Sequence, residues 1–408
     1  MRQVYITGRG LVTPLGNSLA VNEAALRSGK SGISHVPEFI EHKLDSIVGG
    51  IASAEPDYEL ADRKKLRFCP PTAIMSIAAA KEAFAEAGLS PEDVKGKKIA
   101  IVAGVPDSNP VEVFEASNGY LQNDYRLRVV SPCAVPRIMP SNAVSMLSIC
   151  FGIKGESYDV SAACASSAVA VMLGARLIRS GEYDMVLVGG AEAIDWCITL
   201  GFCACHALSK KFNDNPSKAS RPFDIDRDGF VISSGAAYLL LESEKSIKER
   251  NAKPITRISG LGANSNAVDM VVPDAASSAE VMRAAVENAG LKYSDIDYIN
   301  THGTATPVGD PVEMNAIREV FGDRCAINST KSQTGHMIGA TGAAEVVFTS
   351  MMMEKGFISP TINCENPDPA FAWADLVREC RTGVKIRHAL SNSFAFGGSN
   401  CALVLSEV

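Results

Sequence analysis

The sequence predicts an α/β protein built from two duplicated halves, each with a mixed β-sheet covered by helices. Residues 85–94, AEAGLSPEDV, resemble residues 287–296, ENAGLKYSDI. Each segment follows a helical stretch and precedes a strand, at 98–104 in the first half and at 298–302 in the second. This alternation of helices and strands is typical of sheets packed between layers of helices.

The later elements of the two halves also correspond. A helix rich in small residues ends at Gly181 in the first half and at Gly356 in the second. Each half then closes on an apolar strand, at 236–242 and at 401–406. The spacing between matching segments differs, so the first half must contain an insertion. The stretch 109–141, rich in proline and aromatic residues, is the expected insertion.

Composition is that of a cytoplasmic enzyme. The 408 residues are enough for more than one domain-sized core, and the net charge of -7 argues against nucleic acid as the main partner. We expect no membrane span, because apolar runs stay short of roughly 18 residues. The N-terminus enters a strand directly, without the apolar core of a signal peptide. The eleven cysteines lack paired metal-ligand spacing, which predicts reduced thiols and no metal site.

Cys164 is the first candidate for chemistry. It lies in SAACASSA, between an expected strand at 158–160 and an expected helix at 167–180. A cysteine at a helix N-terminus is favoured as the thiolate, because unpaired amides and the helix dipole stabilise negative charge. The residue is therefore either a nucleophile or a buried structural cysteine, which free cysteines often are.

Two histidine motifs favour the nucleophile. His302 lies in NTHGTATPVGDPVE and His336 in KSQTGHMIG, each beside glycine and just beyond a short apolar run. The chain contains only six histidines. A histidine in such a loop can project into a cleft, although a single one is more often structural than catalytic.

Together with other motifs, these residues make the chain resemble the β-ketoacyl-[acyl-carrier-protein] synthases, the elongating condensing enzymes of the thiolase superfamily. The resemblance covers essentially the whole chain and includes VYITGRG at 4–10, ASRPFD at 219–224, RDGFV at 227–231 and NSFAFGGSN at 392–400. The Cys-His-His combination is that of the elongating enzymes, and the residues around Cys164 favour type I over type II synthases.

The resemblance implies a five-layered α-β-α-β-α thiolase-like fold. We expect an N-terminal half at 1–254, which carries the cysteine and the insertion, and a C-terminal half at 255–408, which carries both histidines. The active site is then expected at the junction of the two halves. In this family the region equivalent to 109–141 contributes to the dimer interface and to the acyl pocket.

The resemblance also assigns roles to site residues. Cys164 takes the acyl group, and His302 and His336, as neutral imidazoles, stabilise the enolate formed when a malonyl group loses carbon dioxide. Lys331 and Glu313 organise the network around His336, or else form a plain salt bridge. The oxyanion is expected at the amides of Cys164 and Phe396.

Other residues are expected to bind substrate. The hydroxyls of Thr304 and Thr306 hydrogen-bond the phosphopantetheine arm by resemblance, although loop capping explains them equally well. Phe396 shields the cysteine, with Phe394 on the same motif. Phe202 lies at an acyl-pocket position. The family has glycine before the shielding phenylalanine, whereas this chain has Ala395, which predicts a stiffer gate.

The expected partner is an acyl carrier protein that delivers acyl and malonyl groups, so no dissociable cofactor is implied. Lys64, Lys65, Arg67, Arg126 and Arg128 either dock this acidic partner or form a solvated face. A homodimer is expected. A heterodimer with a chain-length factor is the alternative if the chain belongs to a specialised polyketide or aryl-polyene pathway. Two further hypotheses, a non-catalytic chain-length subunit and a coenzyme-A-dependent thiolase, are disfavoured by Cys164 and by the His336 motif.

Overall fold

The computed structural model describes residues 2–107 and 109–408. The helices are α1 (Leu19–Ser28), α2 (Pro37–Glu41), α3 (Arg63–Leu66), α4 (Pro71–Glu86), α5 (Pro91–Val94), α6 (Pro110–Gln122), α7 (Ala134–Ile138), α8 (Asn142–Phe151), α9 (Ser166–Ser180), α10 (Trp196–Ala204), α11 (Glu244–Arg250), α12 (Ala275–Asn288), α13 (Gly309–Phe321), α14 (Lys331–Thr334) and α15 (Thr341–Lys355).

The strands are β1 (Val4–Val12), β2 (Ile33–His35), β3 (Val48–Gly50), β4 (Ala100–Gly104), β5 (Ser157–Asp159), β6 (Met185–Glu192), β7 (Gly235–Ser243), β8 (Thr256–Ser265), β9 (Tyr298–Asn300), β10 (Ala326–Asn328), β11 (Phe357–Ile358), β12 (Asp375–Leu376), β13 (Arg381–Thr382), β14 (His388–Phe394) and β15 (Ser399–Ser406).

The two halves have the same sheet topology. Strands β1-β7-β6-β4-β5 form one half-sheet and β8-β15-β14-β9-β10 the other, in the same order. In both, the first three strands are antiparallel neighbours and the last three are parallel. The mixed sheets and the duplication expected from the sequence are therefore confirmed. The half-sheets also meet, because β1 and β8 pair at Tyr5 with Arg257 and at Ile6 with Thr256.

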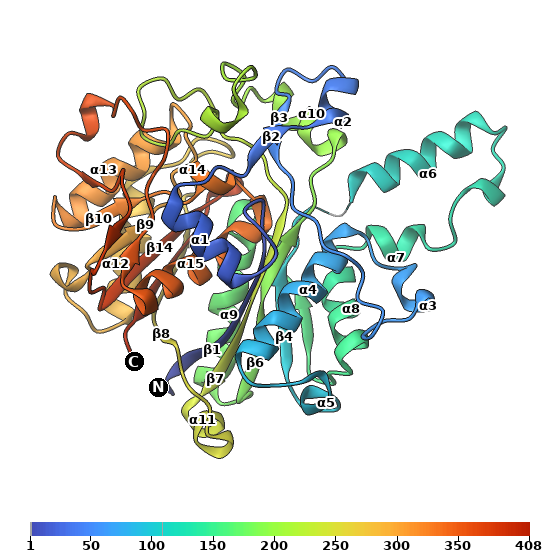
Figure 1. Cartoon of the computed structure of the whole chain (residues 1–408), viewed down its shortest axis with the longest axis horizontal. Helices are drawn as coiled ribbons and strands as arrows, with labels where there is room; N and C mark the ends of the chain where they lie inside the picture. Colours follow the sequence, from blue (N-terminus) through green and yellow to red (C-terminus); the bar gives the residue numbers. More distant parts are fainter. Residues whose placement is uncertain (1, 108) are drawn as a thin grey trace.

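Five layers can be followed in Figure 1, from α12 and α13 on the left, through one half-sheet, α15 and α9 in the centre, and the other half-sheet, to α4 and α8 on the right. Three apolar cores fill the spaces between these layers. The central one joins α9 and α15 to both half-sheets. Strands that are covered on both faces consist of apolar runs, and β7 is buried at every residue.

Helix α9 corrects one expectation about membranes. The stretch Ala163–Ser180 is long and apolar enough to cross a bilayer, contrary to the expectation that no such run exists. Its side chains pack between the two half-sheets, and 61% of the stretch is buried. A helix enclosed by two sheets must be apolar on most of its surface, so the sequence signal here reflects a core position.

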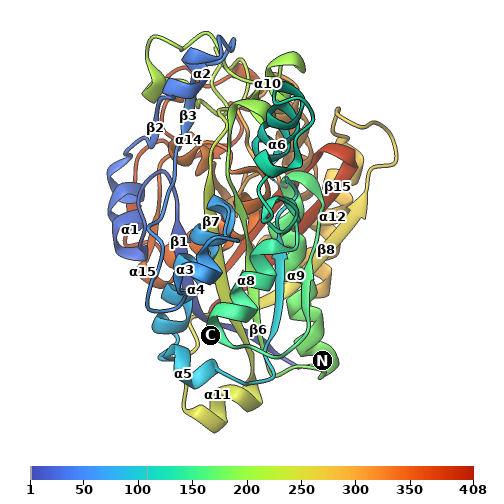
Figure 2. The ribbon, with the colours of Figure 1, turned by 90° about the vertical axis from the view of Figure 1, so that its right-hand side faces the viewer.

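The stretch 109–141 forms an arm that contains α6 and α7. Figure 1 shows α6 extending away from the body, and Figure 2 looks onto the arm from its outer side. No residue of α6 is buried within the chain, and the arm exposes Phe114, Leu121 and Leu127. This arm, between β4 and β5, is the segment for which the sequence predicts an insertion.

Candidate active site

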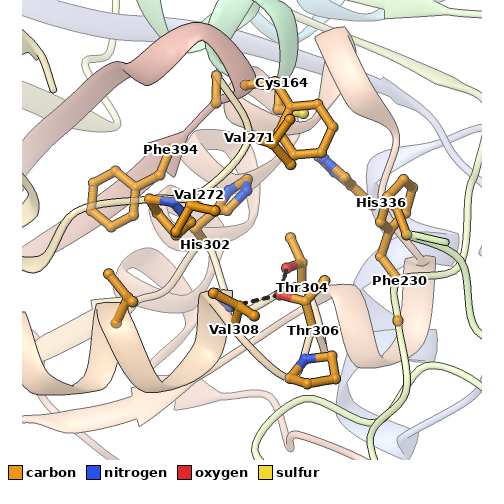
Figure 3. A pocket seen from close by; sticks show the side chains of 18 of the residues that line it. Cys164, Phe230, Val271, Val272, His302, Thr304, Thr306, Val308, His336 and Phe394 are labelled. Atoms are coloured by element: carbon orange, nitrogen blue, oxygen red, sulfur yellow. Dashed lines mark hydrogen bonds between the residues drawn. The ribbon is translucent and has the colours of Figure 1, made fainter. Parts of the chain in front are cut away.

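Nine of the ten residues predicted for the site line a single pocket. This pocket has a volume of about 330 Å³ and receives side chains from both halves. Figure 3 shows Cys164, His302 and His336 facing the same space, with Thr304 and Thr306 at its opposite side. Lys331 is the exception, because it lies fully buried behind the pocket lining. None of the five basic residues proposed for partner docking lines this pocket.

Cys164 lies on a strained turn that enters α9. It is the middle residue of a short 3-10 turn, Ala163–Ala165, directly before the helix. Ala163 has φ 45°, a left-handed conformation that residues with a Cβ rarely adopt. The Ser166 hydroxyl stabilises the turn, since it donates to the Ala163 carbonyl at 2.7 Å and accepts from the Ala162 amide at 2.8 Å. Such strain persists only where the surrounding structure enforces it, and it is concentrated at functional sites.

The ionisation of Cys164 differs from the sequence expectation. Burial raises the pKa of the Cys164 thiol to about 12, although Lys331 and the amide of Phe396 act in the opposite direction. In this conformation the sulfur is therefore a neutral thiol, and the expected thiolate is wrong. The position at a helix N-terminus was visible in the sequence, whereas the burial is produced by residues from distant segments. The Phe396 amide lies near the sulfur, so it is placed to serve as an oxyanion donor for a thioester attacked there.

The two histidines form a neutral pair. Their ring centroids are 5.3 Å apart and the rings are perpendicular, at 89°. Burial lowers the pKa of both His302 and His336 well below the usual value, and the charge of Lys331 lowers both further. The Nδ1 of His336 hydrogen-bonds Thr341 Oγ1 at 3.0 Å, while its Nε2 is buried and has no hydrogen-bond partner among the described residues. Unpaired buried polar atoms are rare, so this nitrogen is available to a substrate.

Glu313 fixes the His302 loop through the backbone. Its carboxylate accepts from the amides of His302 and Gly303, both at 2.8 Å, and from Asn392 Nδ2 at 3.0 Å. Glu313 lies on α13 and Asn392 lies on β14, so two elements hold this loop. The sequence linked Glu313 to His336, whereas the hydrogen bonds of its carboxylate hold the loop of His302. Glu313 positions the other histidine.

Lys331 has a partner that the sequence reasoning missed. Its ammonium group donates to Glu345 Oε1 at 2.6 Å, and both side chains are 1% exposed. Burial raises the pKa of Glu345 to about 7 despite this contact. Lys331 thus places a positive charge near both imidazoles, and the side chain of Glu345 on α15 is its ion-pair partner. A lone acidic residue within the apolar run GAAEVVF was the signal that could have identified Glu345.

Phenylalanine rings close the pocket near the sulfur. The Phe202 ring lies 6.4 Å from Phe396 and 5.3 Å from Phe230. Phe230 was not predicted, yet it also makes an edge contact with His336 at 5.3 Å. Phe394 lies 6.1 Å from His302. These rings form the apolar part of the lining of the pocket that Cys164 and both imidazoles share.

The remaining predicted residues occupy loops at the pocket. The hydroxyls of Thr304 and Thr306 are 3.2 Å apart, and Thr306 also accepts from the Gly309 amide. After Phe396, Gly397 and Gly398 both have left-handed φ values of 79° and 72°. The Gly397 amide donates to the Met270 carbonyl at 2.7 Å, which ties the Phe396 segment to the loop at 266–273.

This duplicated five-layer arrangement, with a cysteine and two imidazoles at the junction, defines a condensing enzyme of thiolase-like fold. Residues 1–246 match the family described as "Beta-ketoacyl synthase, N-terminal domain", and residues 255–365 match "Beta-ketoacyl synthase, C-terminal domain". The chain belongs to the β-ketoacyl synthase family. The resemblance inferred from the sequence is confirmed, as is the expectation of a condensing enzyme.

Individual relatives agree with this assignment. The chain is 38% identical to 3-oxoacyl-[acyl-carrier-protein] synthase 1 of Haemophilus influenzae, over 100% of this chain and 99% of the relative. It is also 38% identical to the synthase 1 of Escherichia coli, over 100% of both chains. Among solved structures, a β-ketoacyl synthase from Burkholderia phymatum superposes with a TM-score of 0.94 and 34% identity, over 100% of both chains.

Proposed function

We propose that this enzyme catalyses the decarboxylative Claisen condensation of a cysteine-bound acyl group with malonyl-acyl carrier protein. The product is 3-oxoacyl-acyl carrier protein, formed during fatty-acid elongation. The observation that carries the proposal is the placement of Cys164, His302 and His336 around one cavity at the junction of the halves. Relatives that are 38% identical over their whole length are 3-oxoacyl-[acyl-carrier-protein] synthases.

In the first stage, Cys164 attacks the carbonyl carbon of an acyl thioester. The new sulfur–carbon bond replaces the bond to the carrier thiol, and the cysteine proton leaves with that thiol. The neutral state of Cys164 supports a proton transfer that accompanies attack. The amides of Cys164 and Phe396 are proposed to hold the tetrahedral oxyanion.

In the second stage, malonyl thioester loses carbon dioxide and becomes an enolate, whose carbon attacks the acyl-cysteine. The carbon–sulfur bond breaks as the carbon–carbon bond forms, and the released cysteine sulfur takes up a proton from solvent. Negative charge develops on the thioester oxygen, and two neutral imidazoles supply N–H donors for it. The lowered pKa of both histidines supports this role, because a neutral imidazole donates without losing its proton.

Other residues at the pocket support the cysteine and the two histidines. Glu313 positions the His302 loop, and Lys331 with Glu345 sets the charge behind both rings. Thr304 and Thr306 are proposed to bind the phosphopantetheine arm of the carrier, so the enzyme needs no separate cofactor. Phe396 and Phe394 shield the sulfur, and Phe202 borders the acyl group.

The whole-chain organisation completes the proposal. The boundary between the halves is placed at residues 254 and 255, between β7 and β8. The exposed apolar side chains of the arm support a homodimer in which a second copy covers them. A cytoplasmic location is proposed. The candidates for contact with an acidic carrier protein are the basic residues Lys64, Lys65, Arg67, Arg126 and Arg128, of which Lys65 is half-buried and the other four are exposed.

A reconstituted reaction tests this function. The purified enzyme is incubated with acyl-carrier proteins of different chain length and with malonyl-carrier protein, and products are read by mass. We expect carbon dioxide release and a 3-oxoacyl product two carbons longer. Condensation of acetyl-coenzyme A without decarboxylation would instead identify a thiolase. Activity that appears only after a second, chain-length subunit is added would favour the specialised-pathway alternative.

A further inference from the structure

The second half contains a turn with the same geometry as the turn that carries Cys164. Residues Ile338–Ala340 form a 3-10 turn directly before α15, as Ala163–Ala165 do before α9. Ile338 has φ 42°, close to the φ 45° of Ala163. A left-handed conformation is costly for a β-branched residue. In this correspondence Gly339 occupies the position of Cys164.

The contacts of the two turns are also reciprocal. Phe396, just after β14 of the second half, lies with its amide near the Cys164 sulfur, and its turn contacts the Cys164 turn. Strand β6 holds the place in the first half-sheet that β14 holds in the second. Glu192, the last residue of β6, accepts from the Gly339 amide at 3.2 Å. Each turn is therefore contacted from the end of the equivalent strand in the opposite half.

Glu192 is held in an unusual state for a carboxyl group. Its side chain is 2% exposed, and Oε1 has no hydrogen-bond partner in the described part of the chain. Burial, with the nearby Asp107 and Asp195, raises the pKa of Glu192 well above its usual value. An unpartnered buried oxygen beside a helix N-terminus indicates more than a packing role.

The space around Gly339 has no room for a side chain. A Cβ at this position would meet the Pro106 ring and would lie 3.2 Å from Glu192 Oε2. The position that holds the nucleophile in the first half is thus filled by groups from the first half itself. The turn also lies between His336 and Thr341, whose hydroxyl holds His336 Nδ1 at 3.0 Å.

We propose that the Ile338–Ala340 turn is a second copy of the nucleophile turn, and that Glu192 acts as its built-in ligand and thereby positions His336. Glu192 is a positioning residue, since it reaches the imidazole only through the Gly339 amide and the turn. The effect of Glu192 on catalysis rests on the function proposed above for His336. The ligand role does not, because it depends only on the contact between Glu192 and the turn.

Removal of the ligand should leave a small amide-lined site that an added molecule can fill. In Glu192→Gly we expect formamide, a neutral group of similar shape, to raise the melting temperature in a saturable manner. Formate is the charged comparison and should bind more weakly, because the site is buried and lies near the carboxyl groups of Asp107 and Asp195. Ala191→Gly, one residue earlier on β6, removes a buried methyl without loss of an amide ligand and serves as the matched control. The ligand role is overturned if formamide raises the melting temperature of the control equally, or if it does not raise the melting temperature of Glu192→Gly.

Partial reactions test the effect on His336. Loss of one buried hydrogen bond predicts a roughly tenfold lower rate of malonyl decarboxylation in Glu192→Gly, while alkylation of Cys164 by cerulenin changes less than about twofold. Formamide should restore decarboxylation. Glu192→Gln keeps a neutral acceptor and should retain wild-type rates even if the glycine variant does not fold. A folded Glu192→Gln variant that decarboxylates roughly tenfold more slowly than the wild type would overturn the proposal. Absence of decarboxylation in the wild type would instead refute the proposed function and leave the thermal test valid.

Discussion

The two halves share a strand order but contribute different chemistry to the junction. The first half supplies a single reactive atom, the Cys164 sulfur, within an apolar setting. The second half supplies the imidazoles and the buried polar network, in which Lys331 pairs with Glu345 and Glu313 holds backbone amides. A duplicated scaffold thus offers two equivalent turns at one junction. One can carry a nucleophile while the other carries the groups that stabilise charge.

The largest effect is expected when the Cys164 sulfur, which the first half supplies, is removed. Cys164→Ala should lower condensation by at least about 10³-fold, because no acyl-enzyme can form. Malonyl decarboxylation should persist, since its donors belong to the second half. Product mass and carbon dioxide release measure the two reactions separately. Loss of both in a folded variant would show that the halves do not divide the reaction in this way.

The next effect concerns the charge pair of the second half. Lys331→Met leaves Glu345 buried without its partner and should lower the free energy of unfolding by about 3 kcal/mol. The pKa of both histidines should rise, because Lys331 lowers both. Urea unfolding measures the stability. The matched double variant Lys331→Met/Glu345→Leu should recover much of the loss, and a double variant no better than the single would argue that charge is not the cause.

Proton linkage at the histidines gives a smaller effect with a defined sign. Folding lowers the pKa of both groups below 6.5, so the stability that their neutral state provides is fully present above pH 6.5 and is lost as pH falls through the folded pKa. At pH 5.5 the unfolded chain is stabilised by about 1.4 kcal/mol per histidine. Buried carboxyl groups whose pKa is raised by folding, such as Glu345, have the opposite effect, because they favour the folded chain as the pH falls.

The comparison with His302→Gln/His336→Gln isolates the histidines. Between pH 7.5 and 5.5 the wild type should lose roughly 3 kcal/mol more than this variant. Urea unfolding at the two pH values measures the difference. Parallel pH profiles of the two proteins would mean that the imidazoles are as easily protonated in the folded chain as in the unfolded one.

Features that depend on local sequence could be predicted, whereas features that depend on contacts between distant segments could not. Cys164, His302 and His336 lie in local motifs, and the duplicated elements are periodic, so both were predictable. The partners of the supporting charges depend on which distant segments the fold brings together. Glu345 is fourteen positions from Lys331, and Glu192 is 147 positions from Gly339. The neutral thiol of Cys164 arises in the same way, because distant residues remove it from water.

The smallest expected effect concerns Ala395, where the two halves exchange contacts beside the sulfur. Ala395 has φ -125° and ψ 155°, an extended conformation that any residue adopts, so its methyl group causes no strain in this state. A restriction arises only if the gate must reach a left-handed conformation, which costs alanine about 1 kcal/mol. Ala395→Gly should therefore accelerate acyl transfer to Cys164 by at most about fivefold in stopped-flow measurements. Gly397 and Gly398 already supply left-handed freedom in the same segment. Identical rates and identical chain-length profiles would mean that these two glycines alone set the opening of the gate.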